Sequence, residues 1–265
     1  MSGVVAAFIT DFGLADHYVG TMKAVLVSLA PVAQIIDITH NVPPQDVRAA
    51  AFQLLASYKY HPTGTLFVCV VDPGVGSDRR IIYAEAGAWR FLAPDNGLLS
   101  WTLAREKPTL LVDMSTPPGI PPPSRTFHAR DVFAPLAARL LKGEPPASLG
   151  ARVNDIARLP FPSVQKTGAR WRGEVIAVDV FGNLVTNLVS AEVEPLAAKS
   201  KIWIDVGSEK TRVRGLSPSY AAAPEGKLLA IDGSSGFIEI SVRNGSAAAA
   251  TKLKVGSPVT VHFRT

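Results

Sequence analysis

Three side chains in the first half of the sequence could act together on one water molecule. Asp72 ends an apolar run and begins the stretch DPGVGSDRR, which brings Arg79 and Arg80 a few residues later. His128 lies in FHARD, after a proline-rich stretch and just before a predicted helix. An acid, a guanidinium and an imidazole from separate loops could hold a water molecule and tune its basicity. Taken alone, each stretch is more often a tight turn or a solvated helix start.

Further acids follow predicted strands, where α/β sheets bind their ligands. Asp11 ends the first apolar run in TDFGLADHY, which also contains Asp16, and Asp95 occurs in PDNG after another run. Asp11 could accept hydrogen bonds from two neighbouring hydroxyls, and Asp16 could meet a cation. A helix N-cap with an acidic first turn is the alternative. The DPGVG turn lacks the Lys-Ser/Thr of a P-loop and the spacing of a dinucleotide fingerprint, so we exclude both.

In the second half, the stretch DVFGNLVTN combines an aromatic ring with polar side chains. It contains Asp179, Phe181 and Asn183. An aromatic ring beside amide groups can stack on a base and hydrogen-bond to its edge. A β-hairpin with a Gly-Asn turn explains the same residues, and GSSGFIEI is likewise typical of a turn that enters a strand.

The elements that must position these residues differ between the two halves. In the first half, continuous apolar runs alternate with amphipathic stretches, which predicts an α/β domain whose sheet is covered on both faces. In the second half the helical pattern disappears, and short apolar runs between Gly, Asn and Pro turns predict an all-β, barrel-like module. We therefore predict an N-terminal α/β domain over residues 1–163 and a C-terminal β-barrel domain over residues 170–265.

Composition excludes several classes of protein. The 265 residues are 47% apolar and 18% charged with a net charge of +5, which excludes a disordered chain. The single cysteine, Cys69, excludes an internal disulfide and metal sites built on several cysteines, and we predict no metal site. The basic residues are scattered along the sequence, so we predict no nucleic-acid partner. No apolar run reaches the roughly 18–20 residues of a membrane span, and no signal peptide precedes the first strand, so we predict a soluble, cytoplasmic protein.

Six motifs occur together and in one order: TDFG, VVDPGVG with the following Arg, APDNG, TFHARDVFAP, DVFGNLVTN and GSSGFIEI. This set extends over nearly the whole chain and resembles the S-adenosylmethionine hydroxide adenosyltransferases, adenosine-forming hydrolases that are related to the fluorinases and chlorinases. The resemblance implies an N-terminal α/β/α sandwich around a central mixed sheet, followed by a C-terminal barrel-like domain. It also implies S-adenosyl-L-methionine as the substrate, no cofactor, and a homotrimer. Each site would then lie between the N-terminal domain of one subunit and the barrel of the next.

The resemblance assigns roles to individual residues. The water-handling set falls on Asp72, Arg79 and His128, and the acid that holds both ribose hydroxyls falls on Asp11. The methionine end of the substrate would meet Asp16, Asp179, Ser234 and Ser235, the last of which is an arginine in the fluorinases. The adenine end would meet Phe181, Asn183, Tyr220 and the backbone from Val242 to Asn244. Tyr18 and Phe127 complete the implied substrate contacts.

Differences from the halogenating relatives favour water over halide as the nucleophile. Those relatives lack the DPGVG-Arg pattern, have a hydroxyl-bearing residue where this chain has Ala129, and have a tryptophan that aligns with Gln45. The leaving group of a sulfonium ion is a neutral thioether, which needs no proton to leave. The enzyme must therefore align and activate a water molecule behind C5′, opposite the sulfur. A guanidinium stays charged, so we expect Arg79 to be the electrostatic partner of Asp72. The sequence leaves open which residue is the base.

We therefore predict hydrolysis of S-adenosyl-L-methionine to adenosine and L-methionine. Two alternatives remain at this stage. One is a halide-using adenosyl transferase, and the other is a non-catalytic protein that binds S-adenosylmethionine or adenosine. An intact Asp-Arg-His set argues against the second, because a binding protein has no use for an activated water molecule.

Overall fold

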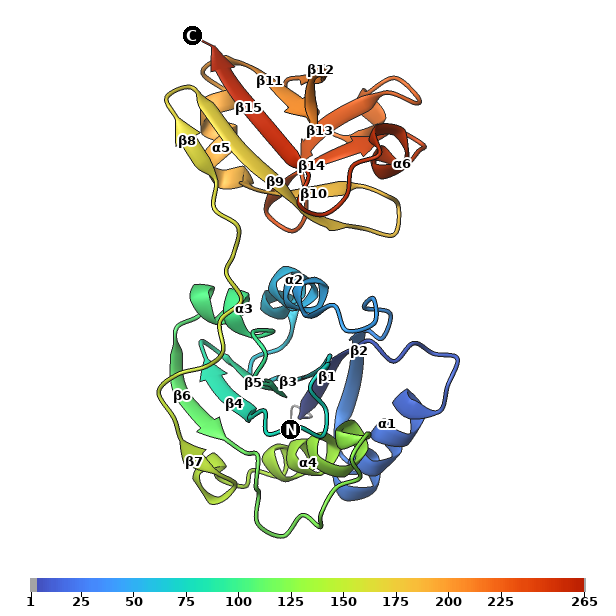
Figure 1. Cartoon of the computed structure of the whole chain (residues 1–265), viewed down its shortest axis with the longest axis vertical. Coiled ribbons are helices and arrows are strands. Elements are labelled where there is room, and N and C mark those ends of the chain that lie inside the picture. Colours follow the sequence, from blue (N-terminus) through green and yellow to red (C-terminus); the bar gives the residue numbers. More distant parts are fainter. Residues whose placement is uncertain (1–3, 265) are drawn as a thin grey trace. The chain divides into compact units, whose positions relative to one another are not determined.

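The computed structural model describes residues 4–264 of the chain, without the side chains of residues 209 and 210. The chain divides between Pro160 and Phe161 into two compact units, which we describe separately (Figure 1). The first is a mixed α/β domain and the second is an antiparallel, nearly closed β domain, so the predicted fold class is confirmed. Over the described residues, no helix is both long and apolar enough to cross a membrane.

The N-terminal domain is built on a seven-stranded sheet with the order β2-β1-β3-β5-β4-β6-β7. Its strands are β1 (Val5–Thr10), β2 (Gln34–Thr39), β3 (Leu66–Val70), β4 (Ile81–Ala86), β5 (Trp89–Pro94), β6 (Pro108–Asp113) and β7 (Ala151–Arg152). Strands β2, β1, β3 and β5 run parallel, whereas β4 is antiparallel to β5 and β6, and β7 is antiparallel to β6. Every residue of β1 and β3 is buried, because layers of helices cover both faces of the sheet.

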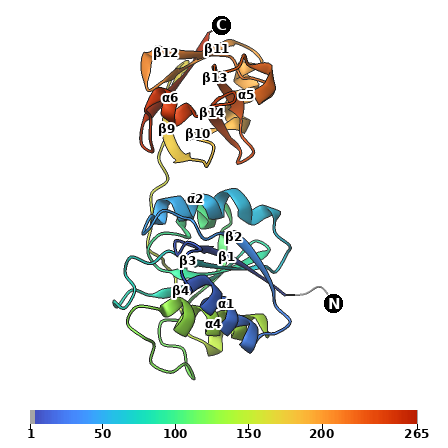
Figure 2. The ribbon, with the colours of Figure 1, turned by 90° about the vertical axis from the view of Figure 1, so that its right-hand side faces the viewer.

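Helices cover each face of this sheet. They are α1 (Tyr18–Leu29), α2 (Val47–Ser57), α3 (Ser100–Arg105) and α4 (Ala134–Leu141), with the 3₁₀ helices η1 (Tyr58–Tyr60) and η3 (Pro146–Ser148) and one π-helical turn, η2 (Ala129–Phe133). Helices α1 and α4 pack together on one face, and α2 and α3 pack together on the other (Figure 2). Phe8 of β1 joins Met22 of α1 and Leu136 of α4 in the core between the first pair and the sheet.

The carboxyl ends of two central strands lie side by side and lead into two of the predicted site acids. The register pairs Thr10 at the end of β1 with Val70 at the end of β3, so Asp11 and Asp72 follow at the same edge of the sheet. The π-helical turn η2 is anchored in the same core through Phe133. Its packing fixes His128, the residue before it, near this edge, as π-turns often do at functional sites.

The C-terminal domain is an eight-stranded antiparallel sheet. Its strands are β8 (Gln165–Thr167), β9 (Arg170–Val178), β10 (Leu184–Val189), β11 (Lys201–Val206), β12 (Ser208–Arg214), β13 (Leu228–Asp232), β14 (Phe237–Val242) and β15 (Pro258–Arg264). The order is β12-β11-β15-β9-β10-β14-β13, with β8 paired to β9. The two end strands, β12 and β13, contact each other, so the sheet nearly closes around a core that includes Val175, Ile204 and Ile240.

This domain also contains two short helices that the sequence pattern did not indicate. They are α5 (Ser190–Ala197) and α6 (Ala247–Thr251), in addition to the 3₁₀ helix η4 (Tyr220–Ala222). Val193 of α5 and Ala247 of α6 are the apolar residues that each buries in the core. Helices this short show no 3.6-residue periodicity, because the pattern needs a window of about 11–18 residues.

Candidate active site

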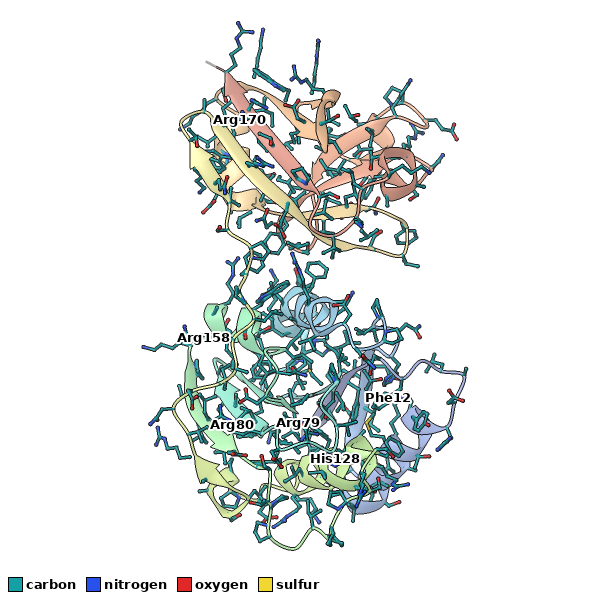
Figure 3. All side chains as sticks on the ribbon, in the orientation of Figure 1. Phe12, Arg79, Arg80, His128, Arg158 and Arg170 are labelled. Carbon is teal, nitrogen blue, oxygen red and sulfur yellow. The ribbon has the colours of Figure 1, made fainter. Side chains whose placement is uncertain are left out.

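Asp72, Arg79 and His128 form one hydrogen-bonded cluster in the N-terminal domain, in which Figure 3 labels Arg79 and His128. Nε of Arg79 donates to Oδ1 of Asp72 at 3.0 Å and to Oδ2 at 2.9 Å, and Nη2 donates to Oδ2 as well. Nη2 also lies 3.0 Å from Nδ1 of His128. The side chains of Asp72 and Arg79 are only 5% and 12% exposed, so salt screens this ion pair weakly. The structure thus brings together the three residues that the sequence singled out.

The contact with Arg79 selects one protonation state of His128. A guanidinium only donates hydrogen bonds, so Nδ1 of His128 accepts here and carries no proton. Burial and then the charge of Arg79 lower the pKa of His128, and they outweigh Asp72, Asp131 and a backbone hydrogen bond with Ser124, which raise it. The imidazole is therefore neutral near pH 7.

Gly76 allows the loop of Asp72 to approach the loop of His128 closely. Its φ of +80° lies in the region that favours glycine, and a Cβ at this position would meet the carbonyl oxygen of Arg125 at 2.4 Å. The tight turn that the sequence suggested is therefore present. It serves to press the loop of the acid against the loop of the histidine.

A cavity of about 280 Å³ opens beside this cluster. Five of the predicted site residues line it: Asp11, Tyr18, Asp72, Phe127 and His128. The rings of Tyr18 and Phe127 meet edge to face with centroids 5.0 Å apart, a favourable geometry for an aromatic pair. The cavity therefore has carboxylates and an imidazole on one part of its wall and aromatic rings on another. Asp16 is exposed and does not line the cavity, so the structure does not bring it to the other five.

Asp11 is held by the loop that precedes α2. Its Oδ2 accepts a hydrogen bond of 2.7 Å from the backbone amide of Gln45. Gln45 has a φ of +64°, an uncommon conformation for a residue with a Cβ, and it also lines the cavity. Backbone strain of this kind clusters at functional sites. Here the strained residue aims its amide at the carboxylate and fixes the orientation of Asp11.

In the C-terminal domain, Asp179, Phe181 and Asn183 share the turn between β9 and β10. The carboxylate of Asp179 accepts hydrogen bonds from the amides of Phe181 at 3.0 Å and Asn183 at 2.8 Å, and from the side-chain amide of Asn183 at 2.8 Å. These bonds hold the turn in shape. Phe181 is 74% exposed, so its ring is available to stack on a ligand.

A buried carboxylate lies on the neighbouring strand β14, and the sequence analysis missed it. Glu239 is 7% exposed and accepts hydrogen bonds from the hydroxyls of Tyr220 at 2.6 Å and Ser241 at 2.8 Å. Burial and then the hydrogen bond to Glu239 raise the pKa of Tyr220, so the phenol keeps its proton. A signal was present, because FIEIS places an acid among apolar residues of a predicted strand. Such an acid is buried only where hydrogen bonds satisfy it.

The remaining candidate residues lie at the two ends of β14. Ser234 and Ser235 are in the turn before this strand, whereas Val242 ends it and Asn244 follows with a φ of +54°. The register of β10 on β14 places the turn of residues 179–183 at the Val242 end. The six residues of β14 separate its ends by about 17 Å. These two groups of residues could therefore contact opposite ends of a long ligand.

Sequence profiles of one family match both domains. The profile for the N-terminal domain of the SAM hydroxide adenosyltransferases matches residues 6–150, and the profile for their C-terminal domain matches residues 173–260. The chain belongs to the SAM hydroxide adenosyltransferase family. The family suspected from the ordered motifs is thereby confirmed, since the two matches include all six of those motifs.

Several curated proteins resemble this SAM hydroxide adenosyltransferase over most of their length. A protein of Thermus thermophilus named (R)-S-adenosyl-L-methionine hydrolase is 41% identical, over 95% of this chain and 97% of its own. A protein of the same name from Salinispora arenicola is 39% identical over 91% of each chain. A fluorinase of Nocardia brasiliensis is more distant, at 28% identity over 97% of this chain and 96% of its own.

Solved structures share the fold of this SAM hydroxide adenosyltransferase. An uncharacterized conserved protein of Thermotoga maritima superposes with a TM-score of 0.91 at 34% identity, over 97% of this chain and 99% of the other. A conserved hypothetical protein of Thermus thermophilus superposes with a TM-score of 0.78 at 37% identity, over 98% and 99%. In the present chain, no three His, Cys, Asp or Glu side chains among residues 4–264 gather as a metal ion would require. That the reaction needs no metal stays a prediction.

Proposed function

We propose that this SAM hydroxide adenosyltransferase hydrolyses S-adenosyl-L-methionine to adenosine and L-methionine. The relatives from Thermus and Salinispora, at 41% and 39% identity, bear the name of such a hydrolase, and the fluorinase is more distant at 28%. The observation that carries the proposal is the Asp72–Arg79–His128 cluster at the wall of the cavity. This cluster offers a buried carboxylate to a water molecule, which a halide would not need.

The hydrogen bonds of the cluster support the proposal that Asp72 handles the water molecule. A carboxylate has about four lone-pair directions, and Arg79 donates three hydrogen bonds to this one. The remaining direction would accept from the attacking water and take its proton as the C5′–O bond forms and the C5′–S bond breaks. Nδ1 of His128 is occupied by Arg79, so His128 positions the guanidinium. No cofactor or metal enters these steps, because the neutral thioether leaves without help.

The substrate would extend from the cavity of one subunit to the 179–183 turn in the C-terminal domain of a neighbouring subunit. Asp11 would accept both ribose hydroxyls, and Phe181, Asn183 and Tyr220 would bind adenine together with the backbone at Val242–Asn244. Asp16, Ser234 and Ser235 would meet the methionine end. The resemblance assigns Asp179 to that end as well, but the register of β10 on β14 brings its turn to the Val242 end, with the residues assigned to adenine. The exposed ring of Phe181 supports this assignment, because an exposed aromatic side chain is favoured where a ligand or another chain covers it.

We also propose the homotrimer and the cytoplasmic location that the sequence analysis predicted. In the trimer, the N-terminal domain of one subunit and the C-terminal domain of its neighbour would complete each site. Closed, ring-like assemblies with identical interfaces of this kind are common among soluble oligomers. A mass of three times the 28.1 kDa chain in light scattering is the expected result.

The test is incubation of the protein with S-adenosyl-L-methionine in ¹⁸O-labelled water, with products analysed by liquid chromatography and mass spectrometry. We expect adenosine and methionine in equal amounts, with the label in the 5′-hydroxyl of adenosine. Unchanged substrate across the neutral and alkaline pH range would exclude the activity. A 5′-chloro product in the presence of chloride would identify the halide-using alternative, and calorimetric binding without turnover would identify a binding protein.

A further inference from the structure

A second cavity, of about 620 Å³, lies in the C-terminal domain on strands that carry no candidate substrate residue. Its polar walls are formed by Lys201, Trp203, Arg212, Arg214 and Arg264. These residues belong to β11, β12 and β15, whereas the candidate substrate residues lie on β14, in η4 and in the turns beside β10 and β14. The volume is typical of sites for small molecules, which measure about 300–1,000 Å³.

The register of the sheet gathers charges that are scattered along the sequence. Lys201 of β11 is paired with Arg264 of β15, and Trp203 of β11 is paired with Arg214 of β12. Alternate residues of a strand point to the same face, so these side chains share one face of the sheet. The cationic character of this face therefore depends on pairing between strands and not on any basic run in the sequence.

Most of the cations at this cavity are not neutralised. Arg212 donates to Asp205 at 2.7 Å. Lys201, Arg214 and Arg264 make no ion pair with any side chain that the structure describes. Lys201 and Arg264 also face each other across neighbouring strands as like charges, an arrangement that destabilises a sheet. A bound anion would remove this repulsion.

Trp203 lines the same cavity, but both faces of its ring are occupied. Its Nε1 is buried and has no hydrogen-bond partner in the described part of the chain. His262 stacks on the indole with centroids 5.1 Å apart, and the guanidinium of Arg212 lies 5.4 Å from the ring centroid. The strands of these two groups, β15 and β12, flank β11 on opposite sides, so the ring is not free to stack on a base. The cavity therefore offers positive charge without an aromatic platform for a nucleobase.

We propose that this cavity binds a small ligand that carries a chain of two or more phosphate groups, at a site separate from the substrate site. Several cations that line one open cavity match the charge density of linked phosphates better than that of a single carboxylate. Inorganic polyphosphate and nucleoside triphosphates share this chemistry. Because the wall lacks a free aromatic ring to stack on a base, the cavity would recognise the phosphate groups of the ligand.

The test is isothermal titration calorimetry of the full chain at low ionic strength with tripolyphosphate, ATP and orthophosphate as separate probes. We expect one tripolyphosphate per chain and ATP binding of similar strength. The double variant Arg214→Gln/Arg264→Gln should weaken both by about ten-fold or more. The matched control Lys227→Gln/Lys254→Gln removes two exposed charges elsewhere in the same domain. It should change the affinity for tripolyphosphate and ATP by less than about two-fold. Circular dichroism melts would verify that both variants fold.

Several outcomes would overturn the proposal. They are no binding of tripolyphosphate, an equal loss in the control variant, or orthophosphate binding as tightly as tripolyphosphate. A short oligothymidylate that binds more tightly than tripolyphosphate and competes with it would instead indicate a nucleic-acid surface. Unchanged affinity in the double variant Arg214→Gln/Arg264→Gln would place any observed binding elsewhere.

Discussion

Arg79 and Arg80 are neighbours in the chain, but their guanidinium groups bind different carboxylates (Figure 3). Arg79 donates to Asp72 at the cavity, whereas Nε of Arg80 donates to Asp95 at 2.8 Å and Nη1 to Asp155 at 3.1 Å. Successive residues of an extended chain point to opposite sides, so only one of the pair can face the cavity. The sequence analysis assigned Arg79 to the site, and this geometry allows the two roles to be separated by experiment.

The first prediction contrasts Arg79→Gln with Arg80→Gln. Without Arg79, Asp72 loses three hydrogen bonds and its orientation, so kcat/KM should fall by about 10²–10³-fold. Arg80→Gln should leave turnover within about three-fold of the parent but lower the free energy of unfolding by about 1–3 kcal/mol, because Asp95 is left buried without its partner. Steady-state kinetics and urea unfolding measure the two effects. Equal losses of turnover in both variants would contradict the assignment.

The second prediction concerns Asp72→Asn, which keeps the shape of the side chain and removes its charge. Because the amide cannot take a proton from water, kcat should fall by about 10²–10⁴-fold. Calorimetry with S-adenosyl-L-methionine should still detect binding, since Asp72 handles water and not the substrate. If Asp72→Asn instead abolishes binding in calorimetry but keeps a normal kcat at saturating substrate, Asp72 is a binding residue.

The third prediction follows from the neutral state of His128. Its pKa is lowered from the ordinary value of 6.5, so the ring stays neutral until the pH falls below that value. Protonation would then remove the acceptor for Arg79 and place a second cation beside it. We therefore expect kcat/KM to hold down through pH 6.5 and to fall at lower pH. The side-chain oxygen of asparagine can accept from Arg79 and does not titrate. In His128→Asn, kcat/KM should therefore fall less at low pH than in the parent.

The same shift links folding to pH. Between the ordinary and the lowered pKa of His128, the unfolded chain binds a proton that the folded chain does not, so the free energy of unfolding rises with pH in this window. His40, whose pKa is lowered first by burial, acts in the same direction. Stability from both groups is complete above pH 6.5 and is lost as the pH falls through the folded values. Urea unfolding at several pH values, with the parent and His128→Asn compared, measures the contribution of His128.

Sequence reasoning predicted local elements better than contacts between residues that are far apart in the chain. Buried strands such as β1 have continuous apolar runs, so a short stretch of sequence is enough to predict them. The contact between Arg79 and His128 joins residues 49 positions apart, so their residue types suggested that they act together but no local pattern showed that they meet. The hydrogen bond between Asp11 and the backbone amide of Gln45 joins residues 34 positions apart. It depends on the positive φ of Gln45, which a glutamine in the sequence does not predict. Asp16 is close to Asp11 in the sequence but does not line the cavity, and its contact with the methionine end stays a prediction.

The fourth prediction tests the exposed ring of the C-terminal turn. Phe181 is 74% exposed, so Phe181→Ala should change the free energy of unfolding by less than about 0.5 kcal/mol. If the ring stacks on adenine, KM should rise by about ten-fold, in line with the energy of aromatic–base stacking. Val180, the neighbouring residue at 92% exposure, provides the matched control, and Val180→Ala should leave KM unchanged. A rise in KM of similar size in the control would mean that the turn acts through its shape.

The last prediction tests whether two subunits share one site. Asp72→Asn disables the N-terminal domain and Phe181→Ala impairs the C-terminal domain, so co-expression of the two variants with different tags gives mixed trimers. If each site combines the N-terminal domain of one subunit with the C-terminal domain of the next, every trimer that contains both variants has both parts intact at about one site in three. Activity in the doubly tagged fraction should then exceed that of either parent variant at low substrate concentration. A site contained within one chain has no intact copy in such a mixture, and activity no higher than that of the Phe181→Ala parent would reject the shared site.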